Sequence, residues 1–255
     1  MRIDNLYRNV MIWVTIVACA LATSCKKGPY SPPGEVNNET ASRIGFYETY
    51  RVAEIAEILS ALNEEATSHN ADADSATFGK LTGFATLVDI SPNAPIVGMV
   101  AANDTAAVDS IIARYGAEFL PPDLKFAWKF KPVEDGTSRH GCYELIALRT
   151  SGVQRGPAMT GETITAAQYE FAEQIGCPVI DLKFDDAGAK ELFRVTSINL
   201  ARNLAIVIGE KVYCFPMVQS PVDGGLVQIT GDFTEEEATQ IVDYIYGQSS
   251  LDLRP

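Results

Sequence analysis

Residues 204–218 read LAIVIGEKVYCFPMV, and this stretch decides the kind of fold that the second half of the chain can form. Residues 204–208 are apolar without interruption, which predicts a strand that is buried on both sides. Gly209-Glu210-Lys211 then reverses the chain into a second strand-forming run over residues 212–218. We therefore expect a sheet in this half of the chain, with helices packed against it.

Upstream of this stretch, apolar and polar residues alternate over 167–171 and again over 180–184, which predicts a β-hairpin. A helix capped by Asp185 or Asp186 should follow the hairpin. The apolar face expected for this helix consists of Ala189, Leu192, Phe193 and Thr196.

Downstream, Gly224-Gly225 predicts another chain reversal before a strand over residues 226–230. Thr234 and Glu237 stand three positions apart, as in a capping box that satisfies two backbone N–H groups at the start of a helix. The apolar stripe of this last helix is Ala238, Ile241, Val242 and Ile245. The predicted order over residues 157–248 is ββαβββα.

The first half of the folded chain, residues 43–150, has a different order. Strands are predicted at 45–50, 97–101, 124–130 and 142–148. The two helices between them are indicated by residues at helical spacing: Val52, Ile55, Leu59 and Leu62 in one, and Val108, Ile111, Ile112 and Tyr115 in the other. Asn103 or Asp104 should cap the second helix, and the polar run 69–74 (HNADAD) indicates a loop. The predicted order is βαβαββ, and the turn-rich residues 150–157 separate the halves.

The N-terminus is typical of an exported protein. Residues 10–22 form an apolar run that is too short for a permanent span, and we expect residues 1–24 to be a signal peptide. The sequence before Cys25 resembles a lipoprotein signal, in which diacylglycerol is attached to the cysteine, although Ala22 replaces the usual large apolar residue. An ordinary cleaved leader is the alternative. Residues 25–42 are rich in Pro, Gly, Asn and Ser, and we expect a flexible tether.

Composition excludes several classes of function. The formal net charge of −13 disfavours a nucleic-acid partner. Two histidines far apart in sequence, His69 and His140, indicate no metal site, and we expect no cofactor. Once Cys19 has left with the leader and Cys25 is lipidated, three cysteines remain. These are Cys142, Cys177 and Cys214, for which small buried apolar residues are favoured and one disulfide stays open.

Several blocks of the second half resemble the head subdomain of SecD. They are Leu204–Ile208, Lys211-Val212-Tyr213, Pro216, Gly224-Gly225, the run from Ile229 to Ala238, Thr160-Gly161-Glu162 and the run from Asp185 to Lys190. The first half resembles the base of the same first periplasmic domain, as in Bacteroidota-type SecDF protein-export subunits. Its blocks are Phe46 to Tyr50, Val97 to Val100, Asp104-Thr105 and Leu120 to Trp128. The family's usual Asp-Gly hairpin turn is Gly209-Glu210 here, and a common glycine is Ala201.

This resemblance implies an α+β fold of two small subdomains, a ferredoxin-like βαβαββ base and a ββαβββα head. It also implies a non-enzymatic periplasm-facing protein that binds translocating or unfolded polypeptide, or an envelope protein, in or after export. No second apolar run follows the leader, so the family's proton-driven work does not carry over. Because Lys26-Lys27 lacks an acidic export-type stretch, we expect a lipid anchor in the inner leaflet of the outer membrane.

Large apolar groups beside turns often mark contact patches, and they direct attention to the region after the 204–208 strand. The candidate partner-binding residues are Tyr213, Phe215, Met217, Gln219, Val222 and Asp223. Packing of two of the apolar four into the core is the competing interpretation. A scaffold or accessory subunit that binds a folded partner such as the translocase is a second functional hypothesis. An orphan hydrolase is a third, but its carboxylate clusters, Asp185-Asp186 and Glu235 to Glu237, stand where helix caps are expected.

Overall fold

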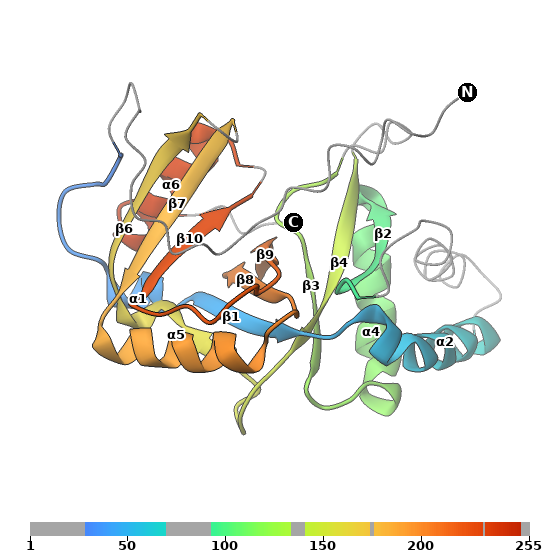
Figure 1. Cartoon of the computed structure of the whole chain (residues 1–255). Helices are drawn as coiled ribbons and strands as arrows, with labels where there is room; N and C mark the ends of the chain where they lie inside the picture. Colours follow the sequence, from blue (N-terminus) through green and yellow to red (C-terminus); the bar gives the residue numbers. More distant parts are fainter. Residues whose placement is uncertain (1–28, 70–92, 134–140, 174–175, 232, 251–255) are drawn as a thin grey trace. The chain divides into compact units, whose positions relative to one another are not determined.

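The computed structural model describes residues 29–69, 93–133, 141–173, 176–231 and 233–250 of the 255-residue chain (Figure 1). The predicted signal peptide, Cys25, residues 70–74 of the predicted loop and His140 lie outside these residues. The described chain contains helices and antiparallel sheets, so the predicted α+β class is confirmed. It folds into two compact units, each assembled from separate stretches of sequence. The predicted domain ranges, 43–150 and 157–248, stay predictions.

Unit 1 consists of residues 1–46, 159–209 and 214–255. Its three-stranded sheet has the order β10-β7-β6, in which β6 (Ile164–Ala172) and β7 (Cys177–Phe184) form the predicted hairpin. The third strand, β10 (Leu226–Thr230), pairs with β7 in antiparallel register, with Ile229 opposite Ile180. The predicted order ββαβββα is therefore confirmed, although only three of its five strands share this sheet.

The strand β8 (Leu204–Ile208) is buried along its whole length, as predicted. It belongs to the other sheet of the chain, next to β1 (Ile44–Thr49), and not to the sheet of β6, β7 and β10. The turn after it has a positive φ of 63° at Gly209, and Glu210 is not among the residues with positive φ. A positive φ at the first turn residue alone is the type II′ pattern, which explains why glycine stands one position earlier than in Asp-Gly turns.

The helices of unit 1 begin as the sequence indicates. The side chain of Asp185 caps α5 (Asp186–Ile198) by accepting a 2.8 Å hydrogen bond from the Gly188 N–H. Thr234 and Glu237 form the predicted capping box at the start of α6 (Glu235–Ile245), which lies against β6 and β7 (Figure 1). The buried face of α6 contains all four predicted residues: Ala238, Ile241, Val242 and Ile245.

One helix prediction is wrong in part. Phe193 of α5 is 46% exposed, while Leu192, Val195 and Thr196 are buried. Phe193 lies 100° around the helix from Leu192, and the buried stripe runs on the other side, through Gly188 and Val195. The predicted face therefore needs Val195 in place of Phe193.

The predicted flexible tether is also wrong over its described part. Residues 30–42 pack on unit 1 and include a short helix, α1 (Asn38–Ala41), capped by Asn37. Ala41 is fully buried, and the Asn37 N–H donates a 3.0 Å hydrogen bond to the Ile245 carbonyl. The short strand β5 (Met159–Thr160) and the one-turn helix η2 (Gly161–Thr163) complete unit 1, and β5 pairs with Gly45 and Phe46. A polar composition did not prevent docking, because each contact uses backbone groups or a few side chains.

Unit 2 consists of residues 47–158 and 210–213. Its central strand, β4 (Cys142–Arg149), pairs with β2 (Ile96–Ala101), β3 (Leu124–Trp128) and the second half of β1, always antiparallel. The strand β9 (Lys211–Cys214) follows the Gly209-Glu210 turn and is shorter than the predicted run 212–218. The observed order of β1 to β4 with α2 (Val52–His69) and α4 (Thr105–Phe119) is the predicted βαβαββ.

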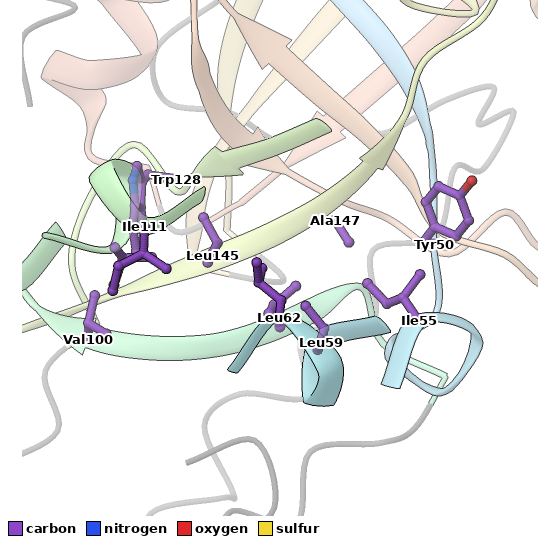
Figure 2. Packing of buried hydrophobic residues seen from close by; sticks show 11 residues of the cluster. Tyr50, Ile55, Leu59, Leu62, Val100, Ile111, Trp128, Leu145 and Ala147 are labelled. Carbon is purple, nitrogen blue, oxygen red and sulfur yellow. The ribbon is translucent and has the colours of Figure 1, made fainter. Parts of the chain in front are cut away.

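The core of unit 2 lies between these helices and β4. Figure 2 shows Ile55, Leu59 and Leu62 of α2 near the strand that carries Leu145 and Ala147. The predicted α2 face is thus confirmed, with Val52 partly buried at its start. Asp104 is the N-cap of α4 and ends a 3-10 turn, η1 (Ala102–Asp104), but its side chain makes no capping hydrogen bond. Within α4, the Asp109 carboxylate accepts a 2.9 Å hydrogen bond from the Trp128 indole of β3.

Candidate functional site

The candidate surface of unit 1 is the segment 215–223, which follows β9 and lies alongside residues 201–204. The Ala201 N–H donates to the Val218 carbonyl at 2.9 Å, and the Val218 N–H donates to the Arg202 carbonyl at 2.9 Å. The Leu204 N–H donates to the Pro216 carbonyl, also at 2.9 Å. These backbone hydrogen bonds hold the segment in place although it is outside any regular strand. Its exposed side chains are therefore attached to a well-fixed backbone.

Thr196 of α5 holds the far end of this segment. Its side chain is fully buried, and its hydroxyl oxygen accepts a 2.9 Å hydrogen bond from the Val222 N–H. The same hydroxyl donates to the Leu192 carbonyl within the helix at 2.7 Å. The segment is therefore tied to α5 by one buried hydroxyl that uses both its donor and its acceptor capacity.

The structure divides the six predicted residues. Tyr213 and Val222 are buried, and Tyr213 belongs to unit 2, where its ring stacks on Phe130 at 4.4 Å between centroids. The competing interpretation, that two of the apolar four are core residues, therefore holds for this pair. β9 ends at Cys214, so Phe215 and Met217 lie outside the strand.

The remaining four predicted residues are accessible to different degrees. Met217 is 40% exposed and Phe215 is half-buried. Gln219 and Asp223 are exposed, and the Asp223 carboxylate accepts a 2.8 Å hydrogen bond from the Gly224 N–H at the following turn. These four residues, all in unit 1, are the members of the predicted contact patch that are accessible to a partner.

Sequence reasoning missed two apolar residues on the neighbouring segment. Ile198 ends α5 with 59% of its surface exposed, and Leu200 two residues later is 47% exposed. Both precede Ala201, which bonds to Val218, so they lie at the same end of unit 1 as Met217. The available signal was Ile198 itself, an apolar residue that falls outside the buried stripe of the amphipathic α5. We call Ile198, Leu200, Phe215, Met217, Gln219 and Asp223 the 198–223 surface.

An ion pair on the exposed face of α5 joins Glu191 and Arg194. Arg194 donates to Glu191 through two of its nitrogens, at 2.7 and 3.0 Å, and these bonds lower the pKa of the Glu191 carboxyl. Both side chains are largely exposed, so their ion pair contributes little to stability.

The two acidic clusters, Asp185-Asp186 and Glu235 to Glu237, lie at the N-terminal ends of α5 and α6 and contribute to their capping. Asp185 caps α5, and the Glu237 carboxylate accepts a 2.8 Å hydrogen bond from the Thr234 N–H. Within the described ranges no group of three His, Cys, Asp or Glu side chains is placed to hold a metal ion. Cys142 and Cys214 are buried, Cys177 is half-buried, and the described part of the chain holds no disulfide among them. In that same part, none of the helices has the length and hydropathy needed to cross a bilayer.

Comparisons with known proteins find a family similarity in the second half of the chain. Residues 145–247 match the family model of the SecDF P1 head subdomain. The protein translocase subunit SecD of Rhodothermus marinus is 32% identical over 150 residues, which cover 58% of this chain and 23% of that protein. The SecD of Syntrophobacter fumaroxidans is 41% identical over 83 residues, 32% of this chain and 16% of that protein. The chain thus spans less than a quarter of either relative.

A solved structure of "a membrane component SecDF that enhances protein export" is 18% identical, with a TM-score of 0.33, over 82% of this chain and 94% of that chain. The class defined by the fold is an α+β protein of two compact units. Its region 145–247, which carries most of β4, the β6–β7 hairpin, α5 and α6, is similar to the SecDF P1 head subdomain.

Proposed function

We propose that this protein is a non-enzymatic, lipid-anchored protein of the cell envelope that binds polypeptide during or after export. The observation that carries the proposal is the 198–223 surface on a region that matches the SecDF head subdomain. Three of its apolar side chains, Ile198, Leu200 and Met217, are each at least 40% exposed. Apolar groups held on a rigid backbone suit contacts with the side chains of an unfolded chain, which has no buried apolar surface of its own.

The surface itself can be tested by substitution. Burying the exposed part of Met217 against a peptide is worth about 1 kcal/mol, or roughly fivefold in Kd. Met217→Asp should therefore weaken binding of a labelled, reduced and carboxymethylated protein by at least this factor in fluorescence anisotropy. Val153→Asp is the matched control, because Val153 is fully exposed and belongs to unit 2. No binding by the wild-type protein, or an equal loss in both variants, would overturn the proposal.

The names of the relatives favour a second candidate function, that of an accessory subunit that binds a folded partner such as the translocase. An immobilised mature chain separates the two candidates. Unfolded polypeptides retained in preference to native ones support polypeptide binding. A single folded envelope protein retained at high salt, with no unfolded chains, supports the accessory subunit and contradicts our first proposal.

The anchor and its location rest on sequence features outside the described residues. We propose that Cys25 carries the lipid and that the protein faces the periplasm from the inner leaflet of the outer membrane. Growth with labelled palmitate should label the wild type and not a Cys25→Ala variant. Density-gradient separation of the two membranes should then place the labelled protein with the outer membrane. Label that persists in the variant would contradict the anchor, and recovery with the inner membrane would contradict the location.

A further inference from the structure

The outer edge of β6 is already occupied by an extended piece of this same chain. β6 is an edge strand of the order β10-β7-β6, so within the described residues one side of it has no neighbouring strand in the sheet. The Tyr30 N–H donates to the Tyr169 carbonyl at 2.7 Å, and the Tyr169 N–H donates to the Tyr30 carbonyl at 2.9 Å. This antiparallel bridge is the minimal form of strand addition, in which main-chain groups of an edge accept a guest chain.

Side chains contribute to the same attachment. The Tyr30 hydroxyl donates to Asp243 of α6 at 2.8 Å, and its ring lies 5.4 Å from the ring of Tyr169. The Ser31 hydroxyl donates to the Ala167 carbonyl at 3.1 Å. Tyr246 donates to that carbonyl as well, at 3.2 Å. The edge groups of β6 at positions 167 and 169 are therefore satisfied, but by residues that remain near the surface: Tyr30 is 37% exposed.

The chain that follows is held differently. Gly34 adopts a positive φ of 116°, and the Gln248 side chain donates to the Pro33 carbonyl at 2.7 Å. Beyond this turn Asn37 bonds to Ile245 and Ala41 is fully buried. Release of residues 30 and 31 therefore leaves α1 and the core of unit 1 in place, because the turn at Gly34 separates the two attachments. We call Tyr30 and Ser31 the edge strap.

We propose that the edge of β6 is a binding site for an extended, unfolded polypeptide, which adds to the sheet as a strand after it displaces the edge strap. The polypeptide as occupant rests on the proposed function, whereas the site rests on the bridge between Tyr30 and Tyr169. Backbone hydrogen bonds do not depend on sequence, so the edge can accept many chains. Displacement also releases the Asp243 carboxylate, which favours a guest with Lys, Arg or Tyr opposite Tyr169.

An internal competitor lowers the apparent affinity. The guest binds only molecules in which the strap has left, so Kd rises in inverse proportion to the open fraction. A strap that is closed in about nine molecules out of ten weakens binding about tenfold. The edge is thereby covered in the absence of a guest, which limits edge-to-edge association of two sheets.

The test uses a fluorescent synthetic peptide of about ten residues, a common strand length, rich in Val, Thr and Lys. A matched peptide carries N-methyl groups on alternate residues and cannot donate along one edge. The wild-type protein should bind the first peptide and should not bind the N-methylated one. Tyr30→Ala/Ser31→Ala should bind the first peptide about tenfold more tightly. Leu226→Ala is the control, because Leu226 is 57% exposed on β10, the opposite edge strand, and should leave Kd unchanged.

Hydrogen exchange in the wild type keeps the inference falsifiable even if the double variant folds poorly. On peptide binding, the Tyr30 amide should lose protection while the Tyr169 amide keeps it. Binding that is equal for both peptides, or an unchanged Tyr30 amide in the bound state, overturns the edge site while polypeptide binding stands. The same holds if a folded double variant shows no gain in affinity. If neither peptide binds to any variant, the proposed function fails, and the edge site fails with it.

Discussion

Replacing the buried hydroxyl of Thr196 by a methyl group tests how the 198–223 surface is held. Thr196→Val keeps the shape of the side chain but removes the acceptor of the 2.9 Å hydrogen bond from the Val222 N–H. Thr196 is fully buried and Val222 is only 4% exposed, so water cannot readily replace the lost partner. A buried N–H without a partner costs about 1–3 kcal/mol. The added apolar group returns less than about 1 kcal/mol.

We therefore expect Thr196→Val to lower the free energy of unfolding of unit 1 by about 1–2 kcal/mol. Urea denaturation followed by circular dichroism measures this loss. Native-state hydrogen exchange adds a local readout, because the Val222 amide should exchange faster than in the wild type by a larger factor than amides in β7. Peptide affinity should fall with it if the segment 215–223 has to be rigid to bind.

Thr196→Ser is the matched control. Serine keeps the hydroxyl and both hydrogen bonds but loses a buried methyl group, which costs about 0.5–1.5 kcal/mol. The two variants can therefore be similar in global stability, whereas only the valine variant should lose protection at Val222. If the Val222 amide stays as protected in Thr196→Val as in the wild type, the hydroxyl does not hold this segment and our reasoning is wrong.

Three further predictions concern single positions in unit 1. Ala201 has a positive φ of 58°, so Ala201→Gly should raise the free energy of unfolding by about 1 kcal/mol in urea denaturation, and a loss would contradict it. Gly188→Ala would place a Cβ in steric clash with the Thr163 hydroxyl oxygen and 2.9 Å from the Thr163 Cβ. It should cost about 1–3 kcal/mol despite better helix propensity, and an unchanged midpoint would refute the clash. The hydrogen bond to Asp243 raises the pKa of Tyr30 above its ordinary value of 10.0, so strap stability is present below pH 10 and lost as pH rises through that raised pKa. Burial also raises the pKa of Tyr47 and Tyr50, so several phenols should titrate late in ultraviolet titration of the wild type. Tyr30→Phe should remove one of these late-titrating phenols, and unchanged absorbance in that late part of the curve would argue against the bond.

Local patterns were enough to predict most of the elements. The buried face of α6 and the fully buried strand β8 can each be recognised from a short stretch of sequence. In such stretches the apolar residues follow the period of the helix or fill the strand without interruption. The caps at Asp185 and Thr234 are equally local, since each side chain bonds to a backbone N–H three residues away. No distant part of the chain is needed to infer such features.

Strand partners and docking could not be predicted in the same way. β8 and β10 are both short apolar runs, yet β10 pairs with β7 and β8 lies beside β1. The edge strap depends on Asp243, which is 213 positions away from Tyr30. Composition predicted a tether there because residues 25–42 have few apolar side chains, and backbone hydrogen bonds leave no mark on composition.

The candidate surface was predicted only in part for a related reason. Proximity to turns suggested that Tyr213 and Val222 are exposed, but a turn does not reveal what packs over it. The ring of Tyr213 stacks on Phe130, and the Val222 N–H donates a hydrogen bond to the buried Thr196 hydroxyl. Ile198 could not be placed from the helical period alone, because that period marks the buried stripe of α5 and not the apolar residues that fall outside it.

The discontinuity of unit 1 has a consequence for how the protein folds when its chain emerges N-terminus first. Gly45 cannot form its β1–β5 pairing until Thr160 has emerged, and more than a hundred residues of unit 2 lie between the two in sequence. Most of unit 2 is continuous in sequence, so it can fold while the early strand of unit 1 is still unpaired. During that interval the apolar residues Ile44 and Phe46, which end fully buried, are open to aggregation or to a chaperone. Substitutions that slow the last steps in unit 1 should therefore reduce the yield of soluble protein more than its final stability.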